Sequence, residues 1–402
     1  PQPPALAPLP LPALHSLSGW YKMPGWSLQK LLLAIIPAAL LVASCYLADV
    51  RGPYSLSQNF DPAYGYLLSS VSILNLEIPA FSDHPGTTIE EIGAAASLAR
   101  WSIERAAGGK EAIAHAALSR PEEYLGTIRW TLALLVCSAL FWAGWQFFSL
   151  TGSLAAAIAA QISVFFFRET IIATANVAPE PLLVATALAF ATVLLPLVLP
   201  IINGSAPSAD REFQIAGWAG ALWGFGVVTK FTFIPAFAVI LIFATQLARL
   251  RFLLSGILSG LLCAMPIWHI IYRPGLWLYG ILTHKGYYGY GEPGILSISQ
   301  AFANFQLLLQ GEPGFFALNA LYLVGLGVVV LRSQPEAKSG HQRRMILATG
   351  LWIVLQFAAA MKHYRAHYIV PAYTLMAMIN GCLVVAIFHK SRGLWQIGRA
   401  HV

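Results

Sequence analysis

The stretch that decides the fold is residues 180–203, EPLLVATALAFATVLLPLVLPIIN, in which Glu180 is the only charged residue. A membrane-spanning helix needs about 20 apolar residues, and this stretch supplies them without interruption. The same alternation of apolar run and polar interruption recurs along the 402 residues. With 57% hydrophobic residues, 10% charged residues and a mean hydropathy of +0.66, the chain has too few polar side chains to cover a water-facing surface. The sequence predicts an all-α polytopic membrane protein.

Ten spans fit the sequence: 28–48, 128–150, 152–168, 180–203, 213–229, 231–248, 252–272, 314–332, 344–361 and 367–389. The fifth and sixth are separated only by Lys230, so we expect a tight helical hairpin there. The spans form one transmembrane domain, 28–389, between a proline-rich tail, 1–27, and a C-terminal tail, 390–402. The first tail lacks a basic start followed by an apolar core, so we do not expect a cleavable signal peptide.

Basic residues cluster at predicted span ends, in alternate connections: Lys22, Lys30, Arg249, Arg251, Arg332, Lys338, Arg343, Arg344, Lys390, Arg392 and Arg399. Short basic connections face the cytoplasm, so ten spans place every cluster and both termini on the cytoplasmic side. The long loops 49–127 and 273–313 then lie on the periplasmic, extracellular or lumenal side. The formal net charge of +7 follows largely from this topology and requires no nucleic-acid partner.

The first outer loop, 49–127, is too long for a plain connector and is expected to hold surface helices. Residues 63–76 carry apolar side chains on one helical face, which is typical of a helix lying on a membrane surface. A second helix is expected to begin near Thr87, with Glu90 in its first turn, and a shorter one to cover 110–118.

Asp61 stands just outside the first span, in the sequence NFDPAYGY (59–66). A carboxylate in a water-poor pocket there could act as a general base and take a proton from an acceptor hydroxyl. Alternatively, Asp61 caps the surface helix, whose first turn would begin with Pro62. The two roles are compatible.

Asp83 and His84 precede the turn dipeptide Pro85-Gly86. His84 beside a carboxylate could position a substrate or carry a proton. The alternative is a polar turn with a helix cap at Thr87 or Thr88.

Six cationic or histidine side chains fall on the predicted outer side: Lys230, Lys285, Lys362, His363, Arg365 and His367. Because the positive-inside bias disfavours this side, we expect them to meet a local anion, and a lipid-linked phosphate is the obvious one. The alternative is snorkelling, or pairing with Glu169, Glu180 or Glu292.

The second outer loop contains a Gly- and Tyr-rich stretch, 286–294, whose aromatic side chains include Tyr288. Such tyrosines stack on sugar rings or sit in the headgroup belt. The following segment, 295–309, is amphipathic and is expected to lie along the outer interface.

Several of these segments, in this order, resemble motifs of integral-membrane glycosyltransferases of the GT-C superfamily, which includes protein O-mannosyltransferases and lipid A aminoarabinose transferases. The resemblance covers most of residues 28–390. Its motifs are Asp61 followed by Tyr64 and Tyr66, the turn His84-Pro85-Gly86, APEPLL at 178–183, GVVTKFT at 226–232, and Lys362 with HYIVP at 367–371.

The resemblance implies an enzyme that transfers a sugar, with inversion, from a polyprenyl-phosphate donor to an acceptor glycan, lipid or protein on the non-cytoplasmic face. In that family the first-loop acid is the base, or a ligand of metal or acceptor, and Asp61 matches it. Donor phosphate would be bound by Lys230, Lys362, Arg365 and His367. The other candidate substrate-binding residues are Asp83, His84, Glu90, Lys285, Tyr288 and His363.

Many relatives have paired acids near the first span, whereas Asp61 stands alone. A divalent metal is therefore a possible cofactor to which no ligand is assigned. The four cysteines lie inside predicted spans and are expected to act as small buried hydrophobes: Cys45, Cys137, Cys263 and Cys382. Acceptor recognition is expected from loops 49–127 and 273–313.

Two other functions compete with the transferase. A lipid or solute transporter, or flippase, would show internal symmetry and broken helices with polar residues at mid-membrane depth. The sequence has no convincing repeat and few mid-depth charges. The third hypothesis is a non-catalytic GT-C-like subunit of a membrane complex, in which Asp61 would have lost its role.

Overall fold

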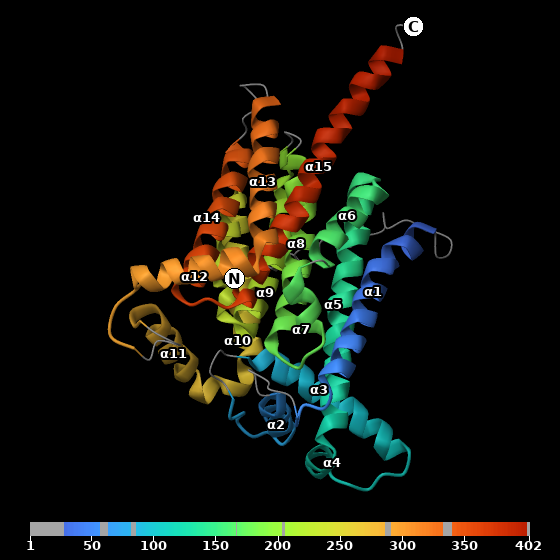
Figure 1. Cartoon of the computed structure of the whole chain (residues 1–402), viewed down its shortest axis with the longest axis vertical. Coiled ribbons are helices and arrows are strands. Elements are labelled where there is room, and N and C mark those ends of the chain that lie inside the picture. The colour runs from blue at the N-terminus through green and yellow to red at the C-terminus, as the bar shows by residue number, and fades with distance from the viewer. Residues whose placement is uncertain are drawn as a thin grey trace, which may run out of the picture.

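The computed structural model describes residues 28–56, 63–81, 86–165, 167–202, 206–285, 291–332 and 340–399. Within these ranges the chain is helical, and its one β-bridge joins His284 and Pro293. Most of the longer helices run along the long axis of the molecule, and short helices collect at one end (Figure 1). Four predicted site residues lie outside the described ranges: Asp61, Asp83, His84 and Tyr288.

The α-helices are α1 Leu28–Arg51, α2 Ala63–Leu74, α3 Thr87–Ala106, α4 Ile113–Ser119, α5 Pro121–Thr151, α6 Leu154–Phe165, α7 Arg168–Thr174, α8 Pro179–Ile202, α9 Ala209–Thr229, α10 Gln246–Cys263, α11 Tyr272–Thr283, α12 Ile298–Gly311, α13 Pro313–Arg332, α14 Gly340–Lys362 and α15 Val370–Arg399. Three 3-10 helices join them: η2 Phe231–Ile242, η3 Met265–Ile270 and η6 Ala366–Ile369.

The described chain has 6 helices long and apolar enough to cross a membrane, or 8 if the bent pairs α6–α7 and α12–α13 each count as one span. The polytopic all-α class is confirmed, whereas the count of ten stays a prediction. The expected sixth span, 231–248, contains the 12-residue 3-10 helix η2 instead of a long α-helix. Pro235 inside η2 lacks the N–H that an α-helix would use. Because a 3-10 helix rises about 2.0 Å per residue, it spans a greater distance than an α-helix with the same number of residues.

Hydrogen bonds define the two ends of the helix bundle. At one end, which we call the Glu212 end, Glu212 accepts hydrogen bonds from the backbone N–H groups of Ala244 (3.1 Å) and Thr245 (3.4 Å). Gln342, near the start of α14, donates to the carbonyl of Ile201 (3.1 Å) at the end of α8. The opposite end, which we call the Lys230 end, contains the start of α8, the end of α9 and the turn between α14 and α15.

The first loop folds into α2, α3 and α4 close to the expected positions. One local expectation is wrong. The N-cap of α3 is Gly86, with φ 63°, and no side chain caps this helix, so neither Thr87 nor Thr88 has the expected capping role. Helix α4 ends at Ser119, before Arg120, and Pro121 begins α5, because proline fits the first helical turn, where no N–H partner is needed.

Helix α9 packs against α10 through glycines spaced four apart: Gly220, Gly224, Gly256 and Gly260. A Cβ added to Gly224 would lie 2.0 Å from the backbone oxygen of Gly256. Small residues allow helix backbones to approach this closely in membrane proteins. This contact fixes α9, whose last residue precedes Lys230.

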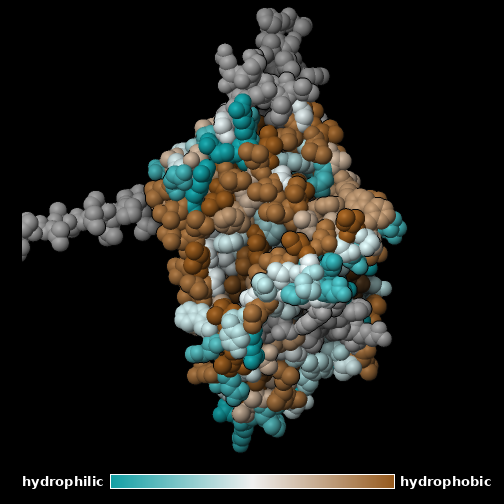
Figure 2. Space-filling view, turned by 90° about the vertical axis from the view of Figure 1, so that its left-hand side faces the viewer, coloured by the Kyte–Doolittle hydropathy of each residue, from teal (hydrophilic) through white to brown (hydrophobic). Residues whose placement is uncertain are grey.

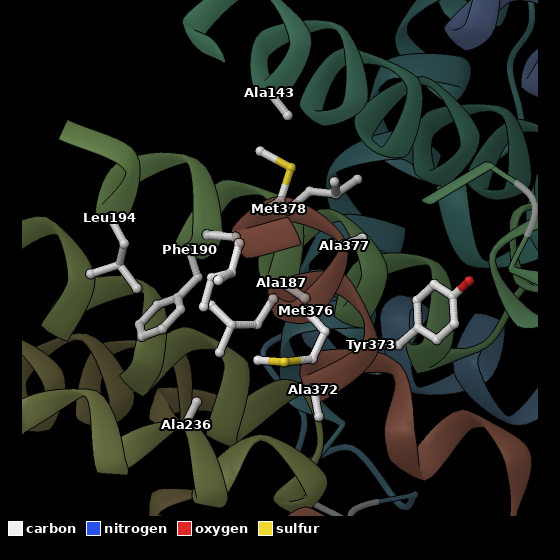
Figure 3. Close-up of a cluster of buried hydrophobic side chains, with 14 of the residues drawn as sticks. Ala143, Ala187, Phe190, Leu194, Ala236, Ala372, Tyr373, Met376, Ala377 and Met378 are labelled. Carbon is white, nitrogen blue, oxygen red and sulfur yellow. The ribbon is translucent and has the colours of Figure 1, made fainter. Parts of the chain in front are cut away.

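The centre of the bundle is formed by α8 and by residues Ala366–Val385, since 83% of the apolar window of each is buried. Phe190 and Leu194 of α8 lie near Met376 and Met378 of α15 in this core (Figure 3). Hydrophobic side chains also cover much of one outer face of the molecule (Figure 2). A chain with an apolar exterior and an apolar core is suited to a bilayer.

The second outer loop contains α12, which lies across the direction of the long helices (Figure 1). Helix α12 meets α13 at an angle of 87°. Ile298 and Phe302 are exposed, whereas Phe305 packs against Phe316 and Phe357. The amphipathic helix expected at 295–309 is confirmed.

Candidate functional site

Three side chains from distant parts of the sequence meet at the Lys230 end. The ammonium of Lys230 forms an ion pair with the carboxylate of Glu180, and its Nζ lies 3.1 Å from Nε2 of His367. His367 Nε2 lies 3.5 Å from Glu180 Oε1. We call this group the Glu180–Lys230–His367 cluster. Glu180 is 7% exposed and Lys230 is 6% exposed, while the His367 side chain keeps 21% of its surface.

Each member occupies the end of a helical element. Glu180 lies in the first turn of α8, where the positive end of the helix dipole favours a carboxylate. Lys230 has an extended backbone (φ −162°, ψ 133°) and is the single residue between α9 and η2. His367 belongs to the short η6 helix that precedes α15. The predicted hairpin at Lys230 is therefore confirmed, and it turns this side chain into the bundle.

The first loop is attached directly beside the cluster. The hydroxyl of Thr88 donates to the hydroxyl of Thr229 (2.9 Å), the residue before Lys230. The hydroxyl of Thr87 donates to the backbone carbonyl of Cys263 (2.8 Å) at the end of α10. The start of α3 is thus fastened to both α9 and α10, next to Lys230.

Glu90 is completely buried, and neither of its carboxylate oxygens has a hydrogen-bond partner within the described residues. Burial raises the pKa of Glu90 to about 9, and Ser69 of α2 opposes this shift only in part. Burial also raises the pKa of Glu91 to about 7. At neutral pH Glu90 therefore carries a proton in the folded protein.

Two other predicted cations, Lys362 and Lys285, make contacts near the second outer loop. Lys362 donates to the carbonyl of Leu282 (2.8 Å) in α11. The backbone N–H of Lys285 donates to the carbonyl of Glu292 (2.8 Å) in the second outer loop.

The rings of His363 and His367 both contact Tyr368, with centroid distances of 5.8 and 4.8 Å. Burial, followed by the charge of Arg365, lowers the pKa of His363, so this imidazole tends to be neutral. The structure therefore joins Lys230 to His367, and the rings of His363 and His367 both lie against Tyr368.

Glu122 was not recognised from the sequence. Its carboxylate accepts hydrogen bonds from the backbone N–H groups of Tyr54 (3.0 Å) and Ser55 (2.9 Å) and from the hydroxyl of Tyr64 (2.7 Å). These partners stand on either side of Asp61 in the sequence. A proline followed by two acids is typical of a helix start, a signal that could have marked Glu122, but no local pattern points to its distant partners.

A neighbouring arginine joins the same region to α8. Arg51, the last residue of α1, donates to the carbonyl of Ala175 (2.7 Å) and to the side-chain oxygen of Asn176 (2.7 Å) in the turn before α8. Its guanidinium lies 3.7 Å from the ring centroid of Tyr54. Arg51 thus ties the beginning of the first loop to the turn that leads to Glu180.

Metal binding has no obvious place in the described part of the chain. No group of three or more His, Cys, Asp or Glu side chains there is arranged to hold a metal ion. Cys137 and Cys382 are buried, as expected, whereas Cys45 and Cys263 are only partly buried. A divalent cofactor therefore has no assigned ligand among these residues.

No protein-family model matches the sequence, and no curated protein matches it. The arrangement of the helices defines an all-α polytopic membrane protein. This fold is similar to that in the crystal structure of ArnT from Cupriavidus metallidurans bound to undecaprenyl phosphate, with a TM-score of 0.53 and 15% sequence identity. The match covers 91% of this chain and 62% of that neighbour, so this chain spans less than two thirds of the neighbour's length.

Proposed function

We propose that this protein is a membrane glycosyltransferase that moves a sugar from a polyprenyl-phosphate donor to an acceptor on the non-cytoplasmic face. The observation that carries the proposal is the Glu180–Lys230–His367 cluster, a largely buried group of ionisable side chains assembled from three segments within a GT-C-like fold. The solved neighbour of this fold binds undecaprenyl phosphate, a ligand of the same chemical class as the proposed donor.

In the proposed reaction an acceptor oxygen attacks the anomeric carbon, and the bond between that carbon and the phosphate oxygen breaks. The acceptor proton passes to a base, for which Asp61 is our candidate. Negative charge grows on the departing phosphate, so a fixed cation beside it lowers the barrier. We assign this role to Lys230, because an ammonium group has three donors and can bind Glu180 and a phosphate oxygen together.

His367 adds to the site in a charge-dependent way. The Lys230–Glu180 ion pair is neutral as a unit, so the net positive charge of the cluster depends on protonation of His367. In the proposal, Lys362 and Arg365 extend the cationic surface, and neutral His363 joins Asp83, His84, Glu90, Lys285 and Tyr288 as candidate contacts to sugar or acceptor. The sugar and the acceptor remain to be identified.

Binding of undecaprenyl phosphate to the purified protein, followed by native mass spectrometry, tests the proposal. The double variant Glu180→Gln/Lys230→Met removes both charges without leaving one buried alone, and it should weaken binding at least tenfold, or about 1.4 kcal/mol. Lys110→Met removes an exposed cation beyond α3 and should bind like the wild type. Equal binding by all three proteins, or no binding by the wild type, contradicts the proposal.

A transporter is the second candidate, because the 87° bend between α12 and α13 is the kind of helix break that such proteins use. The two functions differ in outcome. In sealed vesicles, a transporter moves a fluorescent polyprenyl phosphate across the bilayer without an acceptor, whereas a transferase releases polyprenyl phosphate only when donor and acceptor are both present. Lipid movement without turnover would favour the transporter.

A further inference from the structure

Gln356 lies inside α14, away from any ionised group in the site, and its side chain is fully buried. Its amide nitrogen donates two hydrogen bonds, to the carbonyl of Thr232 (3.0 Å) and to the carbonyl of Tyr368. Its amide oxygen accepts a hydrogen bond from the indole N–H of Trp352 (3.2 Å). All the main polar functions of this glutamine are therefore used.

The two carbonyls flank the cations of the candidate site. Thr232 stands two residues after Lys230, and Tyr368 directly follows His367. The Thr232 carbonyl lies at the start of η2, and the Tyr368 carbonyl belongs to the four-residue helix η6. Hydrogen bonds in 3-10 helices have poorer geometry than those in α-helices, so both carbonyls are weakly held by their own helices. One side chain therefore joins the two segments that bring Lys230 and His367 within 3.1 Å of each other.

Aromatic packing extends this link to the third member of the cluster. Phe190 of α8 contacts Trp352 edge-to-face with ring centroids 5.7 Å apart. Phe190 also contacts Phe233 of η2 in the same way, at 5.6 Å. Since α8 begins with Pro179 and Glu180, the group around Gln356 contacts the helices that carry all three members.

From this geometry we infer that Gln356 is a positioning residue that sets the spacing between Lys230 and His367. The inference deepens the proposed function, and the effect of Gln356 on phosphate binding rests on that proposed function. The geometric part stands on the hydrogen bonds of the described residues alone. Loss of the two donors should let η2 and η6 separate, because each 3-10 segment would keep only its own short ladder.

Gln356→Met tests the inference, because methionine has a similar length and no donor. The matched control is Gln161→Met: Gln161 is also buried and donates to two carbonyls, Leu33 (3.1 Å) and Leu140 (3.0 Å), but these join α1, α5 and α6. Both variants lose two hydrogen bonds to backbone carbonyls, and Gln356→Met also loses the bond from the Trp352 indole, so a general loss of stability should lower both melting temperatures.

The readout is the rate at which diethyl pyrocarbonate modifies His367, measured by peptide mapping without any lipid. Trypsin cleaves after Arg365 and so separates His367 from His363. In Gln356→Met the rate should rise about tenfold, the size expected for the loss of a hydrogen bond or two, and in Gln161→Met it should stay at the wild-type value. An unchanged rate in Gln356→Met, or an equal rise in both variants, overturns the inference.

Binding of undecaprenyl phosphate by the same proteins gives a second readout. If the inference and the proposed function both hold, Gln356→Met binds the lipid about tenfold more weakly than Gln161→Met. If His367 becomes reactive while the wild type binds no lipid, the positioning role stands and the proposed function fails. If the wild type binds lipid and Gln356→Met binds it equally well with unreactive His367, the positioning role fails alone.

Discussion

At the residue scale, Lys230 lies buried in the bundle with Glu180 against its ammonium and His367 beside it. A buried ion pair contributes little net stability, since the loss of hydration offsets most of the attraction. Such a pair is therefore better explained by a role in placing charge than by a role in holding the fold.

Glu180→Gln should destabilise the protein by about 3–5 kcal/mol, because it leaves the Lys230 ammonium buried without its counter-charge. The double variant Glu180→Gln/Lys230→Met should recover most of this loss. Thermal unfolding of the detergent-solubilised variants measures both effects. A single variant as stable as the wild type would show that the pair is open to water in solution.

Glu90→Gln should make the protein more stable at alkaline pH. The folded-state pKa of Glu90 is raised from 4.5 to about 9, so between these values the unfolded chain is ionised while the folded chain keeps the proton. The stability that this proton provides falls as pH rises, by about 1.4 kcal/mol per pH unit. Glutamine removes this dependence.

The measurement for Glu90 is the melting temperature at pH 5.5 and at pH 8 in the same detergent. The wild type should lose more stability between the two values than Glu90→Gln. Glu91, whose pKa is raised to about 7, titrates in both proteins, so their difference isolates Glu90. Glu77→Gln, at an exposed position, is the control and should follow the wild type.

Asp61→Asn should abolish sugar transfer while leaving the melting temperature close to that of the wild type, because asparagine keeps the size and capping ability of aspartate but cannot accept the proton. The assay is release of polyprenyl phosphate from a panel of sugar-loaded lipids in the presence of acceptor. Full activity of Asp61→Asn would remove this residue from the mechanism.

At the element scale, the apolar runs were enough to predict most of the helices. They did not reveal the 3-10 form of η2 around Pro235, the bend between α12 and α13 or the αL cap at Gly86, because none of these is set by hydrophobicity. They also did not reveal contacts between distant segments. For the same reason the sequence indicated Lys230 and His367 as candidates, and left open which carboxylate Lys230 would pair with.

Gly224→Ala should separate α9 from α10, because its Cβ would collide with the backbone of Gly256 and neither backbone can yield locally. We expect a loss of about 1–3 kcal/mol and weaker binding of undecaprenyl phosphate, since α9 carries Lys230 at its end. Gly350→Ala, which has open space around its Cβ position, is the control. Equal stability of both variants would mean that the helices can shift without cost.

At the scale of the whole molecule, the two ends of the bundle differ in charge. Arg249 and Arg343, near the starts of α10 and α14, belong to the Glu212 end, while the first-loop helices gather at the Lys230 end (Figure 1). This separation agrees with the positive-inside pattern read from the sequence. The orientation in the membrane stays a prediction.

Labelling of single introduced cysteines tests this orientation. In sealed right-side-out membranes, a membrane-impermeant maleimide should modify Glu77→Cys at once and Arg343→Cys only after lysis, since both positions are exposed but belong to opposite ends. The wild type, with its four cysteines in membrane-buried helices, gives the background. The reverse pattern would place the candidate site in the cytoplasm.

The hydrogen bonds of Glu122 also bear on protein engineering. The segment after α1 is held by an acid that belongs to α5, so it does not form a self-contained module. Consider a chimera in which this loop comes from a homologue and the exchanged segment ends at Arg120. Glu122 would then come from the host protein, and it would have to bind loop residues of the homologue. Graft boundaries should therefore lie within α5, beyond Glu122, so that the exchanged loop arrives with its own anchor.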